Sequence, residues 1–529
     1  MLNKKIISLS ICIVLLGAMF SGCVEERAEE PDDTVKQDTT QHLNIGIRSL
    51  GHADGFSDPA IGWTGWFSRR IGVYENLIGL DHDMNLKPWL ATSWSAIDDD
   101  TWRFQLREGV TFHDGTTFEA EDVKYSLNRL IDENSAVFNP RAQPLLNIEN
   151  IEVIDEHTID ITTNGTFAPL IYHLTDPLMA IISPESVGKE KIPVGTGPFK
   201  FINQEIGVSI SATRFDDYWD DVAKLNSVTF KLIPDATTRA MALEAGDIDI
   251  ALSISPIDAM RLKNKDGITI EKMETTRAFF LILNTNQTPL DNKNIRQAIS
   301  YAINRDGIVD AVLEGIGGTP AGTLFPHALP WANRDIKPIH NVSVAKNLLD
   351  NAGLKDSDGD GIREYNRMPL QLDFIISTHR EEFLTIGEII KSNLKEIGIE
   401  VTLETYDLGA VRERRRDGDF SISISSWGTA PSGDPAYILD LLIATDGVDN
   451  HGRFSNQQID ELLERGRTTV NVDERIEIYN EIQVLLNHEK PIIPLYHQIL
   501  MHGMRDDIKG LYVHPAEMYL LHNKVYIAK

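Results

Sequence analysis

The sequence predicts a mixed α/β protein with more than one lobe. Three observations support this fold class. A strand pattern, a helix pattern and a second strand pattern follow one another within 369–405. Strand and helix patterns alternate along the rest of the chain from residue 42. The chain has 529 residues, which is enough to bury several hydrophobic cores.

The clearest unit is the one at 369–405. Residues 369–377 alternate between apolar and polar, as a half-buried strand does. Apolar residues then recur at helical spacing over 383–397, and Gly398 stands where a C-terminal cap is expected. Alternation resumes over 399–405. A strand, helix and strand joined this tightly predict a βαβ unit with parallel strands.

Other elements follow from the same patterns. We expect a helix after Asp291, which is a plausible N-cap, and two more helices at 455–467 and 472–488. The region 207–233 contains two alternating runs and predicts strands. We interpret the aromatic cluster around Trp63 as an irregular segment because glycines interrupt it.

The N-terminus has the pattern of a signal peptide. Lys4 and Lys5 precede an apolar run over 6–20, which is too short for a membrane span. Ser-Gly-Cys follows at 21–23 and resembles a lipobox, which implies cleavage after residue 22 and a lipid on Cys23. An uncleaved anchor is the alternative. Both interpretations place the remaining chain on the extracytoplasmic face of the membrane.

Residues 23–41 contain almost no apolar side chains and predict a disordered acidic tether. The second cysteine, Cys12, lies in the leader, so the mature chain has no partner for an internal disulfide. The formal net charge of −29 argues against nucleic acid as a partner, because phosphates are repelled.

Five segments resemble the extracellular solute-binding proteins of family 5, the peptide and nickel receptors of ABC importers. The segments are FQLREGVTFHDGTTFEAEDVKYSLNRL (104–130), VGTGPFKF (194–201), DATTRAMALEAGDIDIAL (235–252), LNTNQTPLDNKNIRQAISYAINRDGIV (283–309) and RRRDGDFSISISSWG (414–428). They stand in the family's order over nearly the whole mature chain.

This resemblance implies a periplasmic-binding-protein-like fold of two lobes joined by two crossing hinge segments. Lobe I takes 42–276 and 498–529, with an extra subdomain at about 83–188, and lobe II takes 277–497. The implied function is capture of a solute between the lobes and delivery to a permease with its ATPase subunits. We expect a monomer that needs no cofactor.

The resemblance also indicates where the ligand lies. Residues 420–424 alternate as a strand, and a loop rich in Gly and Pro follows Trp427. In the family this loop faces the solute. We therefore predict ligand contacts from this loop and from two further positions; the residues are Trp427, Gly428, Ser432, Asp434, Tyr437, Arg380 and Trp63.

The ligand itself is left open between two classes. Dipeptide receptors carry an aspartate where this chain has Pro431, and Asp434 is also a plausible cap for the next helix. Longer peptides remain possible, and a peptide is slightly favoured because peptide receptors are the more frequent members of the family that the chain resembles. Nickel receptors hold a metal chelate through a histidine and arginines; His451 is the candidate metal ligand, with Arg380 and Arg277 as candidate cations by region.

The stretch DSDGDGIRE predicts a calcium loop. Its acidic residues fall at positions 1, 3 and 5, with Gly at position 6, a spacing that turns carboxylates toward one point. Arg367 replaces the usual glutamate at position 12, and a solvated turn is the alternative. The predicted ligands are Asp356, Asp358, Asp360, Ile362 and Glu364.

No motif for catalysis supports an enzyme. A phosphate-binding loop ending in Gly-Lys-Ser/Thr is absent, and so is a Gly-x-Ser-x-Gly turn. We therefore predict a binding protein. The alternative from another class is a secreted hydrolase or glycan-active enzyme that uses carboxylates in its cleft.

Overall fold

The structure is a computed structural model that describes residues 41–50, 58–61, 64–186, 193–327 and 329–528. The predicted leader, Cys23, nearly all of the acidic tether and Trp63 lie outside these residues. Residues 39–529 form one compact unit by their contacts. Within the described residues, every helix is too short or too polar to cross a bilayer.

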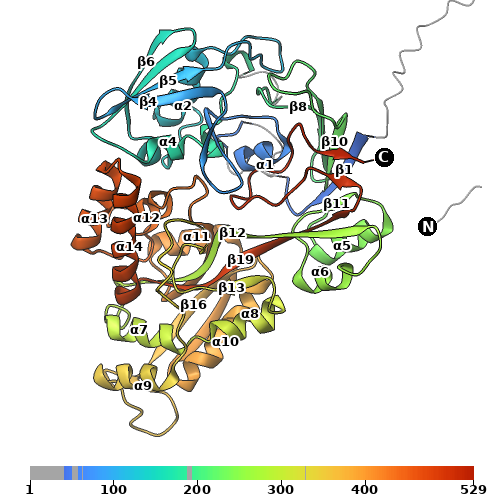
Figure 1. The fold of residues 1–529 in the computed structure, drawn as a ribbon. Helices are drawn as coiled ribbons and strands as arrows, with labels where there is room; N and C mark the ends of the chain where they lie inside the picture. Colours follow the sequence, from blue (N-terminus) through green and yellow to red (C-terminus); the bar gives the residue numbers. More distant parts are fainter. Residues whose placement is uncertain (1–40, 51–57, 62–63, 187–192, 328, 529) are drawn as a thin grey trace, which may run out of the picture. The chain divides into compact units, whose positions relative to one another are not determined.

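One large sheet of eleven strands runs through the molecule (Figure 1). Its order is β17-β16-β18-β12-β19-β11-β1-β10-β9-β8, and β13 pairs with β19 outside this path. The strands are β1 (His42–Ile47), β8 (Phe199–Glu205), β9 (Ser209–Arg214), β10 (Ser227–Leu232), β11 (Ile250–Ala251), β12 (Ile268–Leu283), β13 (Gly318–Pro320), β16 (Gln371–Ser377), β17 (Glu400–Tyr406), β18 (Ile422–Gly428) and β19 (Ile492–Arg505).

Two long antiparallel strands, β12 and β19, join the two ends of this sheet and lie side by side in Figure 1. Their register shifts between Glu274 and Ala278, so that residues 275–277 leave the ladder. Thr276 instead donates its N–H to the carbonyl of Pro515 (2.9 Å). The irregularity coincides with the predicted boundary between the lobes, and it interrupts the pairing of β12 with β19 while Arg277 still pairs with Gly428 of β18.

The βαβ prediction is confirmed. Strands β16 and β17 pair in parallel, with Gln371 opposite Glu400, and α10 (Glu382–Glu396) connects them. Gly398 follows the helix at φ +84°, a left-handed conformation that favours glycine. The apolar face of α10 packs against the sheet and against α7 (Lys293–Ala302) and α8 (Arg305–Leu313). This core is continuous with the buried faces of β12 and β18.

A separate four-stranded sheet, β4-β5-β7-β6, lies within the predicted extra subdomain. Its core is continuous with that of the helices in the C-terminal third, and Ala168 donates its N–H to the carbonyl of Arg467 (2.8 Å). The elements are β4 (Ala91–Ala96), β5 (Thr101–Leu106), β6 (Ile148–Asp155), β7 (Thr158–Thr163), α2 (Ala120–Ile131), α3 (Ala142–Leu146), α4 (Leu170–His173), α12 (Ala436–Leu442), α13 (Gln457–Thr468) and α14 (Val472–Glu489).

The remaining elements are short. They are α1 (Thr64–Ile71), β2 (Ile78–Leu80), β3 (Leu86–Pro88), the 3-10 turns η2 (Pro177–Met179) and η3 (Pro184–Ser186), α5 (Ala236–Ala245), α6 (Pro256–Leu262), α9 (Val342–Asn351), β14 (Glu364–Tyr365), β15 (Met368–Pro369), α11 (Leu408–Asp417), β20 (Ile508–Lys509) and β21 (Tyr526–Ile527).

Three local predictions are wrong. The N-cap of α7 is Asn292, whose side chain accepts from the N–H of Asn294, rather than Asp291. Trp427 lies within β18, because the strand continues through Gly428. The described part of the aromatic cluster forms the regular helix α1.

Candidate functional site

A cavity lies where β12 and β19 leave their regular register. The space inside it, including open solvent at its mouth, is about 810 Å³. Its lining comes from chain segments that are far apart in sequence. The lining residues are Ile47, Arg48, Ser49, Arg70, Leu252, Ser253, Arg277, Arg380, Gln498, Leu500, His502, Val513, His514, Glu517, Tyr519 and Leu520.

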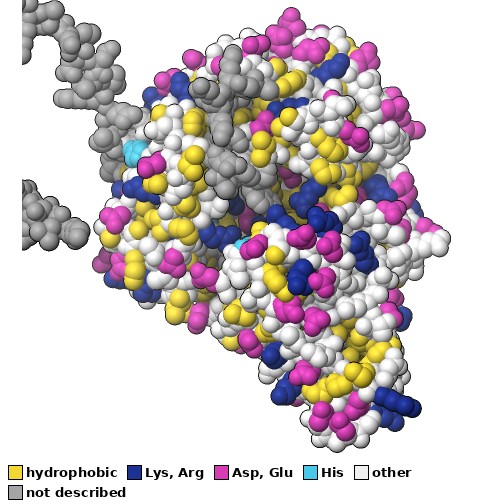
Figure 2. Space-filling view, turned by 180° about the vertical axis from the view of Figure 1, so that it is seen from behind, with side chains coloured by type: hydrophobic (Ala, Val, Ile, Leu, Met, Phe, Trp, Pro, Cys, Tyr) yellow, Lys and Arg dark blue, Asp and Glu magenta, His cyan; other side chains and the backbone are white. Residues whose placement is uncertain are grey.

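Four arginines line this cavity in a strongly acidic protein. Arg48 follows β1 and Arg70 lies in α1. Arg277 lies in β12 at the interruption of its pairing with β19, and Arg380 follows β16. Figure 2 shows a band of basic side chains across the middle of one face of the molecule, with acidic side chains spread widely over the rest. The concentration of guanidinium groups makes this cavity suited to an anionic ligand.

Among the four arginines, Arg380 is held by both a ring contact and an ion pair. Its side chain is 10 % exposed, its guanidinium lies 4.9 Å from the ring of Phe279, and one terminal nitrogen is 3.2 Å from Glu382. Its Nε is buried and has no hydrogen-bond partner among the described residues. Burial, together with the charges of Arg277 and Arg48, lowers the pKa of Arg380 to about 10. The group is therefore still charged at neutral pH, and one of its donors lacks a partner among the described residues.

Arg277 is held by Glu517, the single carboxylate among the described residues that line the cavity. Arg277 donates from Nε to Oε1 of Glu517 (2.9 Å) and from Nη2 to Oε2 (3.1 Å), a two-pronged ion pair. The hydroxyl of Thr275 donates to Oε1 as well (2.9 Å). Burial raises the pKa of Glu517, but the charge and hydrogen bonds of Arg277 outweigh it, and the net shift is downward.

The cavity histidines add no positive charge at neutral pH. Burial lowers the pKa of His502 to about 4 and that of His514 to about 3. His514 donates from Nε2 to the carbonyl of Asp81 (2.9 Å), and its Nδ1 accepts from the N–H of Ala516. Nδ1 of His502 accepts from the N–H of Ser253 (3.1 Å). The positive potential of the cavity therefore comes from the arginines.

A second group of predicted residues gathers around Trp427. The guanidinium of Arg141, which precedes α3, lies 5.1 Å from the Trp427 ring and forms an ion pair with Asp449 (2.9 Å). Nε2 of His451 is 3.9 Å from the other oxygen of Asp449, and burial lowers the pKa of His451. An aromatic ring, a cation and an imidazole thus lie close together. Arg141 is a cation that the sequence analysis did not identify.

The Trp427 group and the cavity adjoin. Arg277 is paired with Gly428 across β12 and β18, and Ala278 with Trp427. Burial raises the pKa of Tyr437, and the charges of Arg141 and Arg277 both act against that increase. Trp66 of α1 also reaches this point, since a Cβ added at Gly428 lies 4.0 Å from its ring. Neither Trp427 nor His451 is among the residues that line the cavity.

Three predicted ligand residues of the loop are buried in the protein. Ser432, Asp434 and Tyr437 are 0 %, 0 % and 7 % exposed. Asp434 forms an ion pair with Arg475 (2.7 Å), and it accepts from the N–H of Ala436 at the start of α12 (2.9 Å). In this structure Asp434 holds the loop against α14 and does not reach the cavity.

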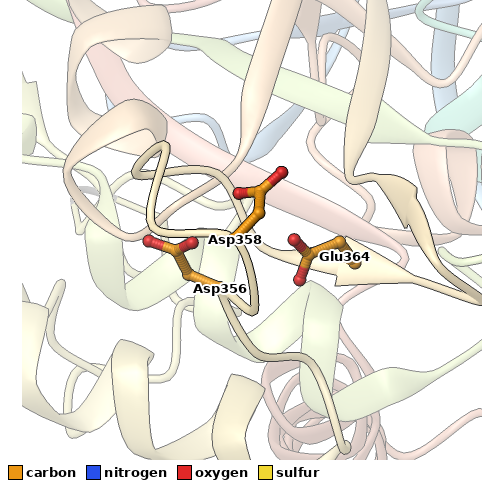
Figure 3. A group of neighbouring side chains, drawn as sticks. All are labelled: Asp356, Asp358 and Glu364. Atoms are coloured by element: carbon orange, nitrogen blue, oxygen red, sulfur yellow. The ribbon is translucent and has the colours of Figure 1, made fainter.

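The predicted calcium loop brings three of its side chains together (Figure 3). Carboxylate oxygens of Asp356, Asp358 and Glu364 lie within 4.8 Å of one another. Asp360 does not belong to this group; its carboxylate accepts from the N–H of Ile362 (2.7 Å). Asp356 accepts from the N–H groups of Gly359 and Gly361, so the loop is preformed by its own turns.

Sequence reasoning reached Arg380 and Arg277 only by region, and it missed Arg48, Arg70 and Glu517. Arg48 follows β1, Arg70 lies in α1, and Glu517 lies in the C-terminal segment. The strand order of the large sheet brings these distant segments together. One sequence signal could have identified Arg48 as a site residue, because it directly follows Ile47, the last residue of a short strand. Such a residue stands at the carboxyl end of a strand, where ligands of open α/β sheets gather.

Comparisons with known proteins agree with this architecture. Residues 85–450 match the middle region of the bacterial extracellular solute-binding proteins of family 5. The chain is 28 % identical to heme-binding protein A of Haemophilus influenzae over 83 % of this chain and 84 % of that protein. It is 27 % identical to the dipeptide-binding protein of Escherichia coli (90 % and 93 %) and 28 % identical to its nickel-binding periplasmic protein (81 % and 84 %).

Solved structures show the same fold. NikA from Brucella suis in complex with Fe(III)-EDTA is 26 % identical and superposes with a TM-score of 0.82, covering 92 % of this chain and 99 % of that one. DppA from Helicobacter pylori in complex with the peptide STSA is 26 % identical with a TM-score of 0.78, covering 94 % and 100 %. The fold is therefore that of the two-lobed periplasmic binding proteins, which bind solutes rather than catalyse reactions. The chain belongs to the bacterial extracellular solute-binding proteins of family 5.

Proposed function

We propose that this protein is the receptor of an ABC importer and that its ligand is a small solute with several carboxylates, such as an anionic metal chelate. The observation that carries the proposal is the cavity lined by Arg48, Arg70, Arg277 and Arg380. The unpaired Nε of Arg380 supports it further, because a buried cation without a full set of hydrogen-bond partners is costly unless a ligand supplies them.

Family frequency favoured a peptide as the ligand. The side chains that line the cavity are less suited to a peptide than to an anionic chelate. Receptors that anchor a peptide amine need a carboxylate that is free to accept from it. Within the part of the chain that the structure describes, the one lining carboxylate is Glu517, which is paired with Arg277, and Asp434 is paired with Arg475. A relative does bind the peptide STSA. Peptide binding is therefore an outcome that the experiment must be able to detect.

The test is isothermal titration with Fe(III)-EDTA, with nickel bis(L-histidine), and with a set of unlabelled tripeptides and tetrapeptides. We expect a chelate to bind, and Arg380→Ala to weaken it by about 10- to 100-fold, the loss expected from charge-assisted hydrogen bonds. Arg380→Lys should recover only part of the affinity, because it keeps the charge without the planar fork. Arg416→Ala, at an exposed arginine of α11, is the matched control and should bind normally.

Two results would overturn the chelate proposal. One is tight binding of a neutral tripeptide together with no binding of any chelate. The other is chelate affinity that is the same in wild type and Arg380→Ala. Native mass spectrometry of protein purified from its own cell provides an independent measurement, since a copurified peptide mass and a copurified metal with an organic acid are readily distinguished.

We also propose that the receptor is held at the extracytoplasmic face of the membrane by a lipid on Cys23. The support is the leader pattern and the Ser-Gly-Cys at 21–23. Permease and ATPase subunits are the expected partners of a monomeric receptor. In cells, Cys23→Ser should move the protein from the membrane fraction to the soluble fraction; intact mass of the membrane form should match a lipidated chain starting at Cys23. A wild-type chain that retains residues 1–22 would contradict the proposal.

The loop at 356–364 is proposed as a structural calcium site. The converging oxygens of Asp356, Asp358 and Glu364 support it. Calcium should raise the unfolding temperature of the wild-type protein, and magnesium should do so less. The double variant Asp356→Asn, Asp358→Asn should lose this response, whereas Asp306→Asn, at an acidic residue in the first turn of α8, should keep it. An unchanged unfolding temperature at millimolar calcium would contradict the site.

A further inference from the structure

We infer that Glu517 determines the charge of the ligand that the cavity accepts. The inference rests on the proposed anion-binding function and names a specificity-determining residue within it. Glu517 is 8 % exposed at its side chain and is the single carboxylate among the lining residues that the structure describes. It occupies the guanidinium fork of Arg277 in the way that a carboxylate of a ligand would.

The protein holds Glu517 in this position through its backbone as well as its side chain. Its φ of +62° is in the left-handed region, which is uncommon for a residue other than glycine, asparagine or aspartate. Its N–H donates to the carbonyl of His514 (2.9 Å), and its own carbonyl accepts from Nε of Arg70 (2.7 Å). Two cavity arginines are thus satisfied by one residue, Arg277 by the carboxylate and Arg70 by the main chain.

The charge of the cavity follows from this arrangement. Among the described lining residues, four guanidinium groups less one carboxylate leave a net charge of plus three, since the lining histidines are neutral at pH 7; Glu382, beside Arg380, is not a lining residue. Arg277 pairs with the carboxylate of Glu517, and Arg70 donates to the main-chain carbonyl of Glu517. Arg380 and Arg48 are therefore the arginines that would bind a ligand. If Glu517 were neutral, the fork of Arg277 would become available and the cavity would gain one positive charge. A ligand with one more negative charge would then be favoured.

The experiment compares two anions that share a chelator and differ in charge, the singly charged Co(III)-EDTA and the doubly charged Ni(II)-EDTA. Affinities are measured by titration calorimetry for wild type and for Glu517→Gln, which has nearly the same shape. We expect the ratio of affinities to shift toward the doubly charged anion by about tenfold in Glu517→Gln, because one additional charge-assisted contact forms. Glu461→Gln, at an exposed residue of α13, should leave the ratio unchanged.

A double variant separates charge selection from a packing role. Arg277→Gln combined with Glu517→Gln removes both members of the pair and restores the net charge of plus three. We expect it to return the affinity ratio to that of wild type, which a loss of packing would not do. If Glu517→Gln alone does not fold, Thr275→Val removes one hydrogen bond to the same carboxylate and should shift the ratio in the same direction by a smaller factor.

The outcomes distinguish this inference from the proposed function. If wild type binds the chelates through Arg380 but Glu517→Gln keeps the wild-type ratio, the role of Glu517 is wrong and the proposed function stands. The same conclusion follows if the double variant behaves like Glu517→Gln. If wild type binds neither anion, the proposed function fails, and this inference fails with it.

Discussion

At the scale of single residues, burial lowers the pKa of both arginine and histidine, with a different outcome for the charge of each at neutral pH. Burial brings the pKa of Arg380 down to about 10, so the guanidinium keeps its charge at neutral pH. The same effect brings the pKa of His502 to about 4, so the imidazole loses its charge. Because both values lie well away from 7, the cavity has the same charge throughout the physiological pH range. Anion binding should therefore depend little on pH near neutrality.

His497 carries a prediction about stability and pH. It is fully buried, its Nε2 donates to the carbonyl of Thr323 (3.0 Å), and its Nδ1 has no partner among the described residues. Burial lowers its pKa to about 4, below the ordinary value of about 6.5. Between these two pH values, His497 binds more protons in the unfolded chain than in the folded one. The contribution of His497 to the free energy of unfolding is therefore fully present above about pH 6.5 and is lost as pH falls toward 4.

Acidification from pH 6.5 to pH 4 should lower the free energy of unfolding by roughly 3 kcal/mol through His497 alone. The measurement is urea unfolding at several pH values for wild type and His497→Gln, which keeps a donor for Thr323. The variant should be less stable at neutral pH and should lose less on acidification. Parallel curves for the two proteins would show that His497 does not titrate in this way.

At the scale of elements, Arg475 joins three segments of the C-terminal third. It is 1 % exposed, pairs with Asp434 of the loop after β18, and donates from Nε to the carbonyl of Gly466 in α13 (2.9 Å). The charge of Asp434 and hydrogen bonds outweigh burial and keep Arg475 protonated, since the net shift of its pKa is upward. Arg475 thereby fixes the loop that follows Trp427.

Arg475→Ala should lower the free energy of unfolding by about 3–5 kcal/mol, because it leaves Asp434 buried without its partner. Arg465→Ala, at an exposed residue one helix earlier, should change it by less than about 0.5 kcal/mol. Chemical denaturation measures both. A loss for Arg475→Ala no larger than that of the control would mean that water or rearrangement satisfies Asp434, and that the pair does not hold the loop.

The sequence predicted elements well where the signal was local. The βαβ unit at 369–405 was readable because alternation, helical spacing and Gly398 all agree. The helix α1 was missed because Gly65 was read as a breaker. In the structure Gly65 serves close packing instead, since a Cβ there would lie 2.8 Å from the carbonyl oxygens of Pro59 and Pro177. The approach to Pro177 depends on a residue more than a hundred positions away.

The candidate site was less predictable for a related reason. Arg277 and Arg380 could be named by region because the family resemblance indicates which loops approach a ligand. Glu517 could not, since its role depends on a pairing with Arg277 across 240 positions and on a backbone conformation that no local pattern indicates. Asp434 shows the opposite error: a loop position typical of a ligand contact is used here for an internal ion pair.

At the scale of the whole molecule, the predicted lobes share structure. One sheet runs through both, and a single apolar core joins the four-stranded sheet to α12, α13 and α14. Shared cores unfold cooperatively. Differential scanning calorimetry should therefore give one unfolding transition, and a bound anionic chelate should move that whole transition upward. Two separate transitions, only one of which responds to the chelate, would show that the lobes are energetically independent.

The irregular step in β12 has a consequence for how occupancy is sensed. Residues 275–277 have given up their ladder bonds to β19, and Thr275 and Arg277 both hold Glu517 at the cavity wall. A sheet yields most easily where its ladder is interrupted. A ligand in the cavity would contact residues at this interruption directly, so we expect binding to stiffen this part of β12 without a relay through the rest of the fold.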